Sequence, residues 1–443
     1  MINDPINSIS FDNTEYAFAY KSTDELKKAH FLFSSMGNPF VLNMGLSLMP
    51  AAIKLHIPFT KAIIRKTIFS QFVGGETLEQ TAKVANKLEK YNVQVILDYG
   101  VEGGSDGEKG FDHATEEFIK VINYAATQRN IPFMSIKVTG IVRFGLLEKM
   151  DAAMHNSEGS LINRYNKVLN ELTDAEKSEW QRVVKRIEKI CEVAIIKKTG
   201  VLIDAEETWI QDPVDALTIL MMDKYNKQNA VVYNTIQLYR HDRLAFLKDS
   251  FAAADERDFI LGAKLVRGAY MDKERKRAAD LGYPSPIQPD KEASDRDYNA
   301  AVEFCIDHIN RIALIVASHN EYSNLLTTEL LDKKLVLKDS DPFDYAKAER
   351  LFPVAKKLTV DYKIVGIGVG ADKFKDDPHF VSVGEDPFGD EKSEVLTHDT
   401  DQNRDRLLKP GVVSQILELE PEVVISGMAA TWQAQILNLA HVQ

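Results

Sequence analysis

The segment from Lys264 to Tyr270, Lys-Leu-Val-Arg-Gly-Ala-Tyr, combines a cation, a step of small residues and an aromatic ring within seven positions. An apolar run delivers a basic residue, Arg267, the next two residues, Gly268 and Ala269, have little or no side chain, and the aromatic Tyr270 follows. This shape lets a flat, electron-poor ring lie against the backbone while Tyr270 covers the neighbouring space. A plain strand-to-helix turn, with the glycine supplying only conformational freedom, explains the same residues. The segment alone therefore leaves both interpretations open.

Polar and ionisable residues lie at the ends of six short, β-branched apolar runs. Such runs, separated by longer helix-forming stretches, indicate a parallel sheet covered by helices. In a closed (β/α) barrel the carboxyl ends of the strands converge on one rim, where the active site lies. The runs are Val93–Leu97, Pro132–Val138, Val201–Ile203, Val231–Ile236, Phe259–Val266 and Ile312–Ala317, and the polar groups at their ends are Asp98, Lys137, Asp204 to Glu207, Gln237 to Arg240, Arg267 with Tyr270, and His319 to Glu321.

The fold class that we expect is α/β, specifically a (β/α)8-type TIM barrel that is distorted or incomplete at strands 7 and 8. An open doubly wound sheet is the alternative, but it would concentrate its ligand groups at one switch point after a glycine-rich first turn. Six consecutive polar strand ends fit the barrel better. The string Gly366–Ala371 lacks the glycine spacing and the following helix of a dinucleotide-binding turn, so we discount it.

Around this barrel the hydrophobic periodicity predicts four regions of the chain. They are an N-terminal helical region at residues 1–90 (helices at Ser22–Phe33 and Gly75–Tyr91), a barrel core at 91–332 with a helical insertion at 141–198 (Leu161–Leu172 and Lys177–Ile196), an atypical polar insertion at 333–420 (loops at Asp339–Asp344 and His379–Arg406 around a strand-like run at Tyr362–Val369), and a last barrel strand and helix at 421–443.

Composition narrows the class of protein. The 443 residues carry a formal net charge of −12, which argues against a nucleic-acid partner, because such a partner selects a basic surface. Cys191 and Cys305 are too few for a disulfide framework or a thiolate metal site. The acidic start of the sequence is untypical of a secretory signal. We expect a cytoplasmic protein. A buried helical region is the simpler interpretation of residues 30–75, and peripheral contact with the inner membrane is the alternative.

The segment from Lys264 to Tyr270, with its continuation through Tyr283 to Tyr298, resembles the signature of FAD-dependent proline dehydrogenases. Further motifs resemble the barrel strands of that family in order and spacing, so that the resemblance covers roughly residues 70–330. These motifs are Ile96–Glu102, Ser135–Thr139, Ile203–Glu207, Tyr233–Tyr239 and Val316–Asn320.

The resemblance implies oxidation of L-proline, or of a close cyclic amino acid, to 1-pyrroline-5-carboxylate by hydride transfer to FAD. In such an enzyme the flavin carries the redox chemistry and the protein supplies orientation and electrostatics. Electrons would pass on to a quinone-type acceptor, as part of proline catabolism.

The same resemblance assigns roles to single residues. Lys137 and Asp204 match a pair beneath the substrate, where the carboxylate contacts the ammonium and the substrate amine; a purely structural ion pair is the alternative. Tyr270 borders the substrate and completes the expected catalytic set with these two. Lys264 matches a cation near flavin N5, which stabilises negative charge on the reduced ring. The expected cofactor-binding residues are Asp204, Gln237 at the isoalloxazine edge, Lys264, Val266, Gly268, Ala269, Tyr270, and Ser294 with His319 at the diphosphate and adenosine end.

Two observations keep other functions open. His319 in Ser-His-Asn is a candidate ligand of a metal-dependent barrel hydrolase, but the first strand offers no His-x-His, so we assign no metal. The stretch Met271–Arg277 is dense in charge and predicts a solvated helix face.

The departure from the family lies towards the C-terminus. Val423–Met428 resembles a seventh strand, but the family's final helix carries two adjacent arginines that clamp the substrate carboxylate. The chain contains no Arg-Arg dipeptide, and Arg404 with Arg406 cannot share a helical face. Loss of such bonds costs ~1.5–3 kcal/mol each. A catalytically impaired flavin-binding barrel, acting as a binding or interaction protein, is therefore the second hypothesis.

Overall fold

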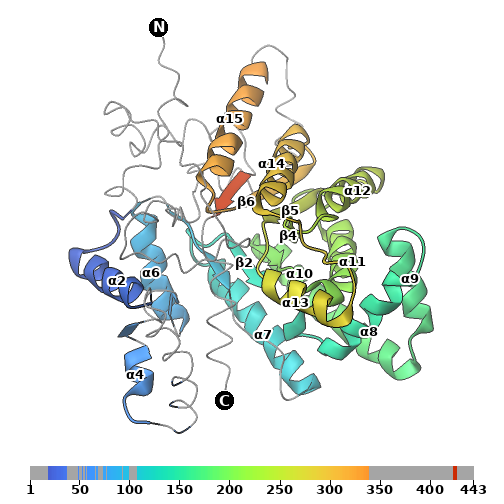
Figure 1. Cartoon of the computed structure of the whole chain (residues 1–443), viewed down its shortest axis with the longest axis horizontal. Coiled ribbons are helices and arrows are strands. Elements are labelled where there is room, and N and C mark those ends of the chain that lie inside the picture. Colours follow the sequence, from blue (N-terminus) through green and yellow to red (C-terminus); the bar gives the residue numbers. More distant parts are fainter. Residues whose placement is uncertain are drawn as a thin grey trace.

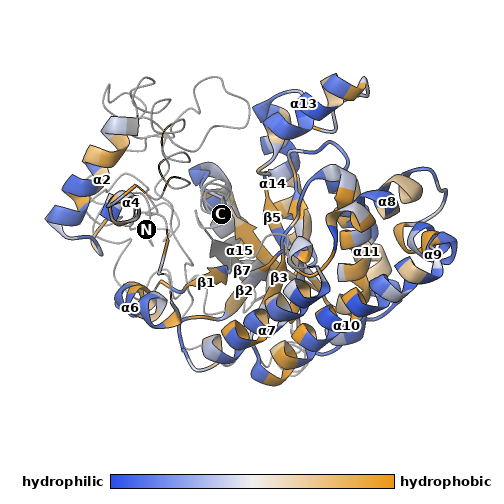
Figure 2. Cartoon of the chain, turned by 90° about the horizontal axis from the view of Figure 1, so that it is seen from below, coloured by the Kyte–Doolittle hydropathy of each residue, from blue (hydrophilic) through white to orange (hydrophobic). Residues whose placement is uncertain are grey.

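The computed structural model describes residues 18–36, 77–91, 93–98, 107–338 and 423–426, with shorter pieces between residues 48 and 75. Its centre is one sheet of seven parallel strands whose spatial order is the order of the sequence. The sheet curls into a TIM-barrel-like arrangement with helices around it (Figures 1 and 2). The strands are β1 (Ile96–Asp98), β2 (Phe133–Ile136), β3 (Gly200–Ile203), β4 (Val232–Gln237), β5 (Leu261–Val266), β6 (Ile312–Ala317) and β7 (Val423–Ser426).

All six strands predicted from the apolar runs are present, and β6 has the predicted bounds. The first run differs, because Val93 to Val95 precede β1 and only Ile96–Asp98 pairs with β2. The predicted seventh strand is confirmed: β7 pairs with β6 in parallel, with Leu314 opposite Val423 and Ala317 opposite Ser426. Within the described residues no pair joins β1 to β7.

Helices occupy the connections and cover the outer face of the sheet (Figure 2). The predicted insertion between β2 and β3 consists of three helices, the longest of which begins at a capping box formed by Thr173 and Glu176. The helices of the barrel are α7 (Glu108–Ala125), α8 (Phe144–His155), α9 (Leu161–Glu171), α10 (Asp174–Lys197), α11 (Thr208–Tyr225), α12 (Arg243–Glu256), α13 (Met271–Leu281), α14 (Lys291–Asp307) and α15 (Glu321–Lys338), with a short 3-10 turn, η3, at Val138–Gly140.

The N-terminal region contains helices, as predicted, namely α2 (Thr23–Met36), α4 (Thr60–Ile64) and α6 (Leu78–Glu89). No helix of the described residues is long and apolar enough to span a bilayer. The predicted loops at Asp339–Asp344 and His379–Arg406, the strand-like run at Tyr362–Val369 and the helix after β7 lie outside the described residues.

Two apolar clusters stabilise the barrel. The larger lies between the outer face of the sheet and the helices and includes Met134, Ile203 and Ile236. The smaller consists of residues on the opposite face of the same strands, among them Phe133, Leu202 and Tyr233. Because side chains alternate between faces along a strand, this second cluster is the inside of the barrel. The rings of Phe133 and Tyr233 meet edge to face with centroids 5.6 Å apart, which closes the barrel interior below the rim.

Candidate active site at the rim of the barrel

The pleat of the strands brings the predicted site residues to one rim. Counting in steps of two from the interior residues Phe133, Leu202 and Tyr233 leads to Lys137, Asp204 and Gln237. Strand register agrees, because Ile136 lies opposite Ile203, and Lys137 and Asp204 each come directly after these residues. On β5, Lys264 lies opposite Thr235 and Ile315, and Ile315 is also an interior residue. Four predicted residues from four strands therefore face the same interior space.

Asp204 is the centre of a buried polar cluster in this space. Its Oδ1 accepts hydrogen bonds from Ser135 Oγ and from Lys264 Nζ, both at 2.7 Å. Lys264 is only 2% exposed, so its ammonium depends on this carboxylate for compensation. The sequence predicted Lys137 on the second strand as the partner of Asp204, and that pairing stays a prediction. The observed partners are Ser135 and Lys264, so the carboxylate bridges β2, β3 and β5.

Glu206, two residues beyond Asp204, belongs to the same site although it was not among the predicted site residues. Its carboxylate accepts hydrogen bonds from Thr139 N at 3.1 Å and Thr139 Oγ1 at 2.7 Å. Burial raises the pKa of Glu206 to about 7, against the opposing effect of Thr139 and the nearby positive charge of Lys137. The carbonyl oxygen of Glu206 accepts a hydrogen bond from Gln237 Nε2 at 2.8 Å, which fixes the orientation of that predicted side chain.

The turn after β5 has the shape that the sequence suggested. Gly268 has φ of +146°, and a Cβ atom there would lie 2.4 Å from the ring of Tyr239, so neither the conformation nor the space admits a side chain. Val266 lies opposite Gln237, and Ala269 leads from the glycine to Tyr270. Position 268 therefore presents backbone without a side chain.

Tyr270 directly precedes α13, makes no side-chain capping bond to it, and lies near the acidic residues that follow β3. Burial raises the pKa of its hydroxyl well above the usual value, and the negative charges of Glu206, Glu207 and Asp204 act in the same direction. The Tyr270 hydroxyl therefore stays protonated at neutral pH and is available as a hydrogen-bond donor at this rim.

A second polar cluster lies where β5, β6 and α14 meet. Arg267 donates to Asp295 Oδ1 at 2.6 Å and to Ser318 Oγ at 2.7 Å, and its guanidinium stacks on the ring of Tyr298 at 4.3 Å. Lys291 also pairs with Asp295, at 2.8 Å. Half-buried His319 directly follows Ser318 at the end of β6. This cluster is cationic and hydroxyl-rich, as an anionic diphosphate requires.

The hydroxyl of Ser294 bears on whether the residues around Arg267 could bind a cofactor. It is fully buried and has no hydrogen-bond partner among the described residues. Buried polar atoms are ordinarily paired, so an orphaned hydroxyl on the helix that carries Lys291 and Asp295 fits a bound group that supplies the partner. Together with the turn at Gly268, these residues fit the flavin cofactor that the family resemblance implies. The described residues include no group of three His, Cys, Asp or Glu side chains arranged as metal ligands.

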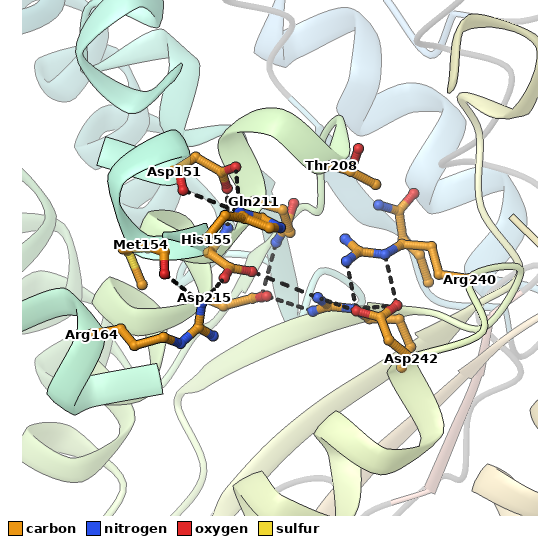
Figure 3. A network of polar contacts seen from close by, with 12 residues as sticks. Asp151, Met154, His155, Arg164, Thr208, Gln211, Asp215, Arg240 and Asp242 are labelled. Carbon is orange, nitrogen blue, oxygen red and sulfur yellow. Dashed lines mark hydrogen bonds and ion pairs between the residues drawn. The ribbon is translucent and has the colours of Figure 1, made fainter. Parts of the chain in front are cut away.

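A network of polar contacts on α11 and at the start of α12 holds the residues that follow β3 (Figure 3). Gln211 Oε1 accepts a hydrogen bond from the backbone N–H of Glu206 at 2.7 Å, and Gln211 Nε2 donates to Asp215 at 2.9 Å. Asp215 is fully buried and pairs with Arg243 at 2.6 Å. Arg243 also contacts Asp242. The loop that carries Asp204 and Glu206 is therefore tied to α11 and to the start of α12.

Comparison with known protein families gives a match over most of the barrel. The profile of the family described as proline dehydrogenase matches residues 81–362, more than half of the chain. Proline dehydrogenase 1, mitochondrial, of Dictyostelium discoideum is 29% identical over 352 residues, covering 73% of this chain and 61% of that protein. Hydroxyproline dehydrogenase of Xenopus laevis is 30% identical over 280 residues, covering 59% of this chain and 60% of that protein.

A third relative has a different printed role. The carbapenem antibiotics biosynthesis protein CarD of Pectobacterium carotovorum is 32% identical over 254 residues, covering 57% of this chain and 62% of that protein. The chain thus spans about three fifths of the length of these relatives.

Among solved structures, proline utilization A of Bdellovibrio bacteriovorus, inactivated by N-propargylglycine, aligns with a TM-score of 0.51 at 17% identity. The alignment covers 75% of this chain and 34% of that one, and it supports the barrel fold.

Proposed function

Because the chain belongs to the proline dehydrogenase family, we propose that it oxidises L-proline, or a close cyclic amino acid, to 1-pyrroline-5-carboxylate. The proposed cofactor is FAD, which supplies the redox chemistry by accepting the hydride from the ring carbon next to nitrogen. The observation that carries the proposal is the Asp204–Lys264 pair inside the barrel rim, next to the side-chain-free turn at Gly268.

Residues of the rim have separate tasks in this proposal. Asp204 binds the substrate amine, and its fixed contacts to Ser135 and Lys264 orient the carboxylate before the substrate arrives. Lys264 places a positive charge where negative charge develops during the reaction. Lys137 faces the same space from β2. Tyr270, which remains protonated, closes the site and excludes water from it.

The remaining predicted residues hold the cofactor. Gln237 would meet the edge of the ring, while Val266, Gly268 and Ala269 would support its face. Ser294 and His319 would contact the diphosphate and adenosine end, and Arg267, which is bonded to Ser318, would join them. Arg267 donates to three different side chains, Asp295, Ser318 and Ser323, and these bonds fix the position of its guanidinium.

We also propose a quinone-type electron acceptor and a cytoplasmic location with peripheral contact at the inner membrane. Exposed apolar side chains of the N-terminal region support the membrane contact. Phe31 on α2 is 71% exposed and Ile63 on α4 is 62% exposed. Co-sedimentation with anionic lipid vesicles tests this: protein that stays wholly in the supernatant would contradict the membrane contact.

The proposed reaction predicts a yellow protein whose flavin is bleached by its substrate. We expect the absorbance near 450 nm of the purified protein to fall when L-proline is added under anaerobic conditions, and to stay constant with D-proline. A protein that remains colourless after incubation with FAD would contradict the proposal.

One observation favours a second candidate function. The 443 residues include no adjacent arginine pair, which the family uses to hold the substrate carboxylate. If no other group holds the substrate carboxylate, the barrel binds flavin without oxidising proline and serves as a binding or interaction protein. Bound FAD that L-proline does not reduce at any concentration would favour this candidate, and rapid reduction would eliminate it.

A further inference from the structure

Glu274 is a fully buried carboxylate in one of the most polar helices of the protein. It is the fourth residue of α13, whose neighbours Lys273, Arg275 and Lys276 are charged, and yet its exposed fraction is 0%. A charge-dense stretch of this kind predicts a solvated face, and for Glu274 that prediction is wrong. Burial of a carboxylate is costly, so its contacts must compensate for the lost hydration.

The contacts of Glu274 are with the first residue of another helix. Thr208 begins α11, and both its backbone N–H and its hydroxyl donate to the Glu274 carboxylate at 2.7 Å. The residue before it, Glu207, makes no side-chain capping bond to α11. The free N–H group at this helix end is therefore capped by a carboxylate from α13, where the helix dipole also favours negative charge.

Neighbouring side chains of α13 reinforce this contact. Lys273 forms an ion pair with Glu207. The guanidinium of Arg277 lies 4.4 Å from the centre of the Trp209 ring. Three successive residues of the β3–α11 connection, 207 to 209, are thus each held by α13. Arg277 also pairs with Glu148 of α8 at 3.1 Å, so α13 contacts one further helix of the ring.

The β3–α11 connection and the start of α13 each carry a predicted site residue. In the β3–α11 connection this residue is Asp204, three residues before Glu207. At the start of α13 it is Tyr270, whose carbonyl oxygen accepts a hydrogen bond from the Glu274 N–H at 2.9 Å. Glu274 therefore joins the turn that ends in Tyr270 to the loop that carries Asp204.

We propose that Glu274 is a positioning residue: by capping α11 it fixes α13 and so holds Tyr270 over the substrate end of the site. Glu274 acts through Tyr270 and does not itself contact the substrate. The proposal rests on the proposed function for its kinetic consequence, while the contact itself is independent of that function.

The experiment compares Glu274→Ala and Glu274→Gln with Lys276→Ala, a variant of the same helix whose side chain is 75% exposed. Hydrogen–deuterium exchange is the readout that needs no activity. In Glu274→Ala we expect loss of protection at residues 207–209 and 270–274, with β5 unchanged. Glu274→Gln retains one oxygen acceptor, so its protection should be intermediate between those of the wild type and Glu274→Ala. The protection of Lys276→Ala should match that of the wild type.

Kinetics supply the second readout. We expect kcat/KM for proline to fall ~10-fold to ~100-fold in Glu274→Ala, because small displacements of a positioned group have effects of this size. In a Tyr270→Ala background the same change should have little further effect, since coupled residues are not additive.

Three outcomes separate the hypotheses. If proline fails to reduce the wild-type flavin, the proposed function fails while the exchange experiment still tests the Glu274 contact. Unchanged exchange at residues 207–209 and 270–274 in Glu274→Ala would overturn the proposal. So would full additivity of the Glu274 and Tyr270 changes, because it would mean that Glu274 stabilises the fold without acting through Tyr270.

Discussion

Glu206 shows how strongly the barrel rim alters a single side chain. Its carboxyl group is sealed from solvent, and burial raises its pKa from 4.5 to about 7. A carboxyl group whose pKa is raised on folding contributes its full stabilisation at pH values below the pKa of the unfolded chain. This contribution is lost as the pH rises through the pKa of the folded state. Glu206 therefore favours the native state at mildly acidic pH and opposes it above neutrality.

Replacement of Glu206 by Gln should remove this dependence. We expect the free energy of unfolding of the wild type to decrease between pH 5 and pH 8 relative to the variant, by on the order of 3 kcal/mol. Urea denaturation of both proteins across this range measures the difference, in which the other titrating groups cancel. Parallel stability curves would show that Glu206 has an ordinary pKa.

Asp204 and Gln237 could be predicted as residues of one site because each directly follows an apolar run, while Lys264, inside its run, was assigned from the family resemblance. Glu206 and Glu274 were not predicted as site or positioning residues. Their roles depend on the contacts with Thr139 and Thr208, and these partners are distant in the sequence. A run of charged residues such as Met271–Arg277 contains no local signal for the one member that becomes buried.

The turn between β5 and α13 is the element on which the site depends most. Two separate restraints require glycine at position 268, namely its φ of +146° and the ring of Tyr239. Gly282, at the end of α13, has φ of +73° but no atom within 4 Å of the position of a Cβ. The two glycines thus share the conformational restraint and differ in the steric one.

The variants Gly268→Ala and Gly282→Ala separate these effects. Gly282→Ala should cost only about 1 kcal/mol, the expense of a left-handed alanine. Gly268→Ala should cost about 2 kcal/mol more, because overpacking displaces the Tyr239 ring. It should also lower the flavin content of the purified protein. Thermal unfolding and the ratio of absorbance at 450 and 280 nm measure both effects, and equal behaviour of the two variants would contradict the assigned role of the turn.

At the scale of the elements, sequence patterns predicted the strands better than their connections. Strands β4, β5 and β6 are buried on both faces, and the β-branched and apolar residues that this burial requires are what makes them recognisable. In the first run, only Ile96–Asp98 pairs with a neighbouring strand, since apolar character alone does not determine where the hydrogen bonds begin. The docking of α13 on the β3–α11 connection depends on tertiary contacts and had no signal in the sequence.

The whole molecule is a barrel in which seven parallel strands place residues from distant parts of the sequence at one rim. Lys137 and His319 are far apart in the chain, yet both lie just beyond the ends of strands of this sheet. The (β/α) topology could be predicted because polar strand ends recur along the sequence. The closure of the barrel beyond β7 could not be predicted, since the sequence after Val423–Met428 offers no motif of a further barrel strand.

The central claim is that this rim seats a flavin beside the Asp204–Lys264 pair. A crystal structure of the protein with FAD, soaked with a cyclic carboxylate that mimics proline, tests it most directly. We expect the isoalloxazine ring to lie on the backbone of Gly268 and Ala269, with its edge hydrogen-bonded to Gln237 and with Lys264 near its centre. A flavin bound elsewhere on the molecule, with these residues outside its contact distance, would contradict the account.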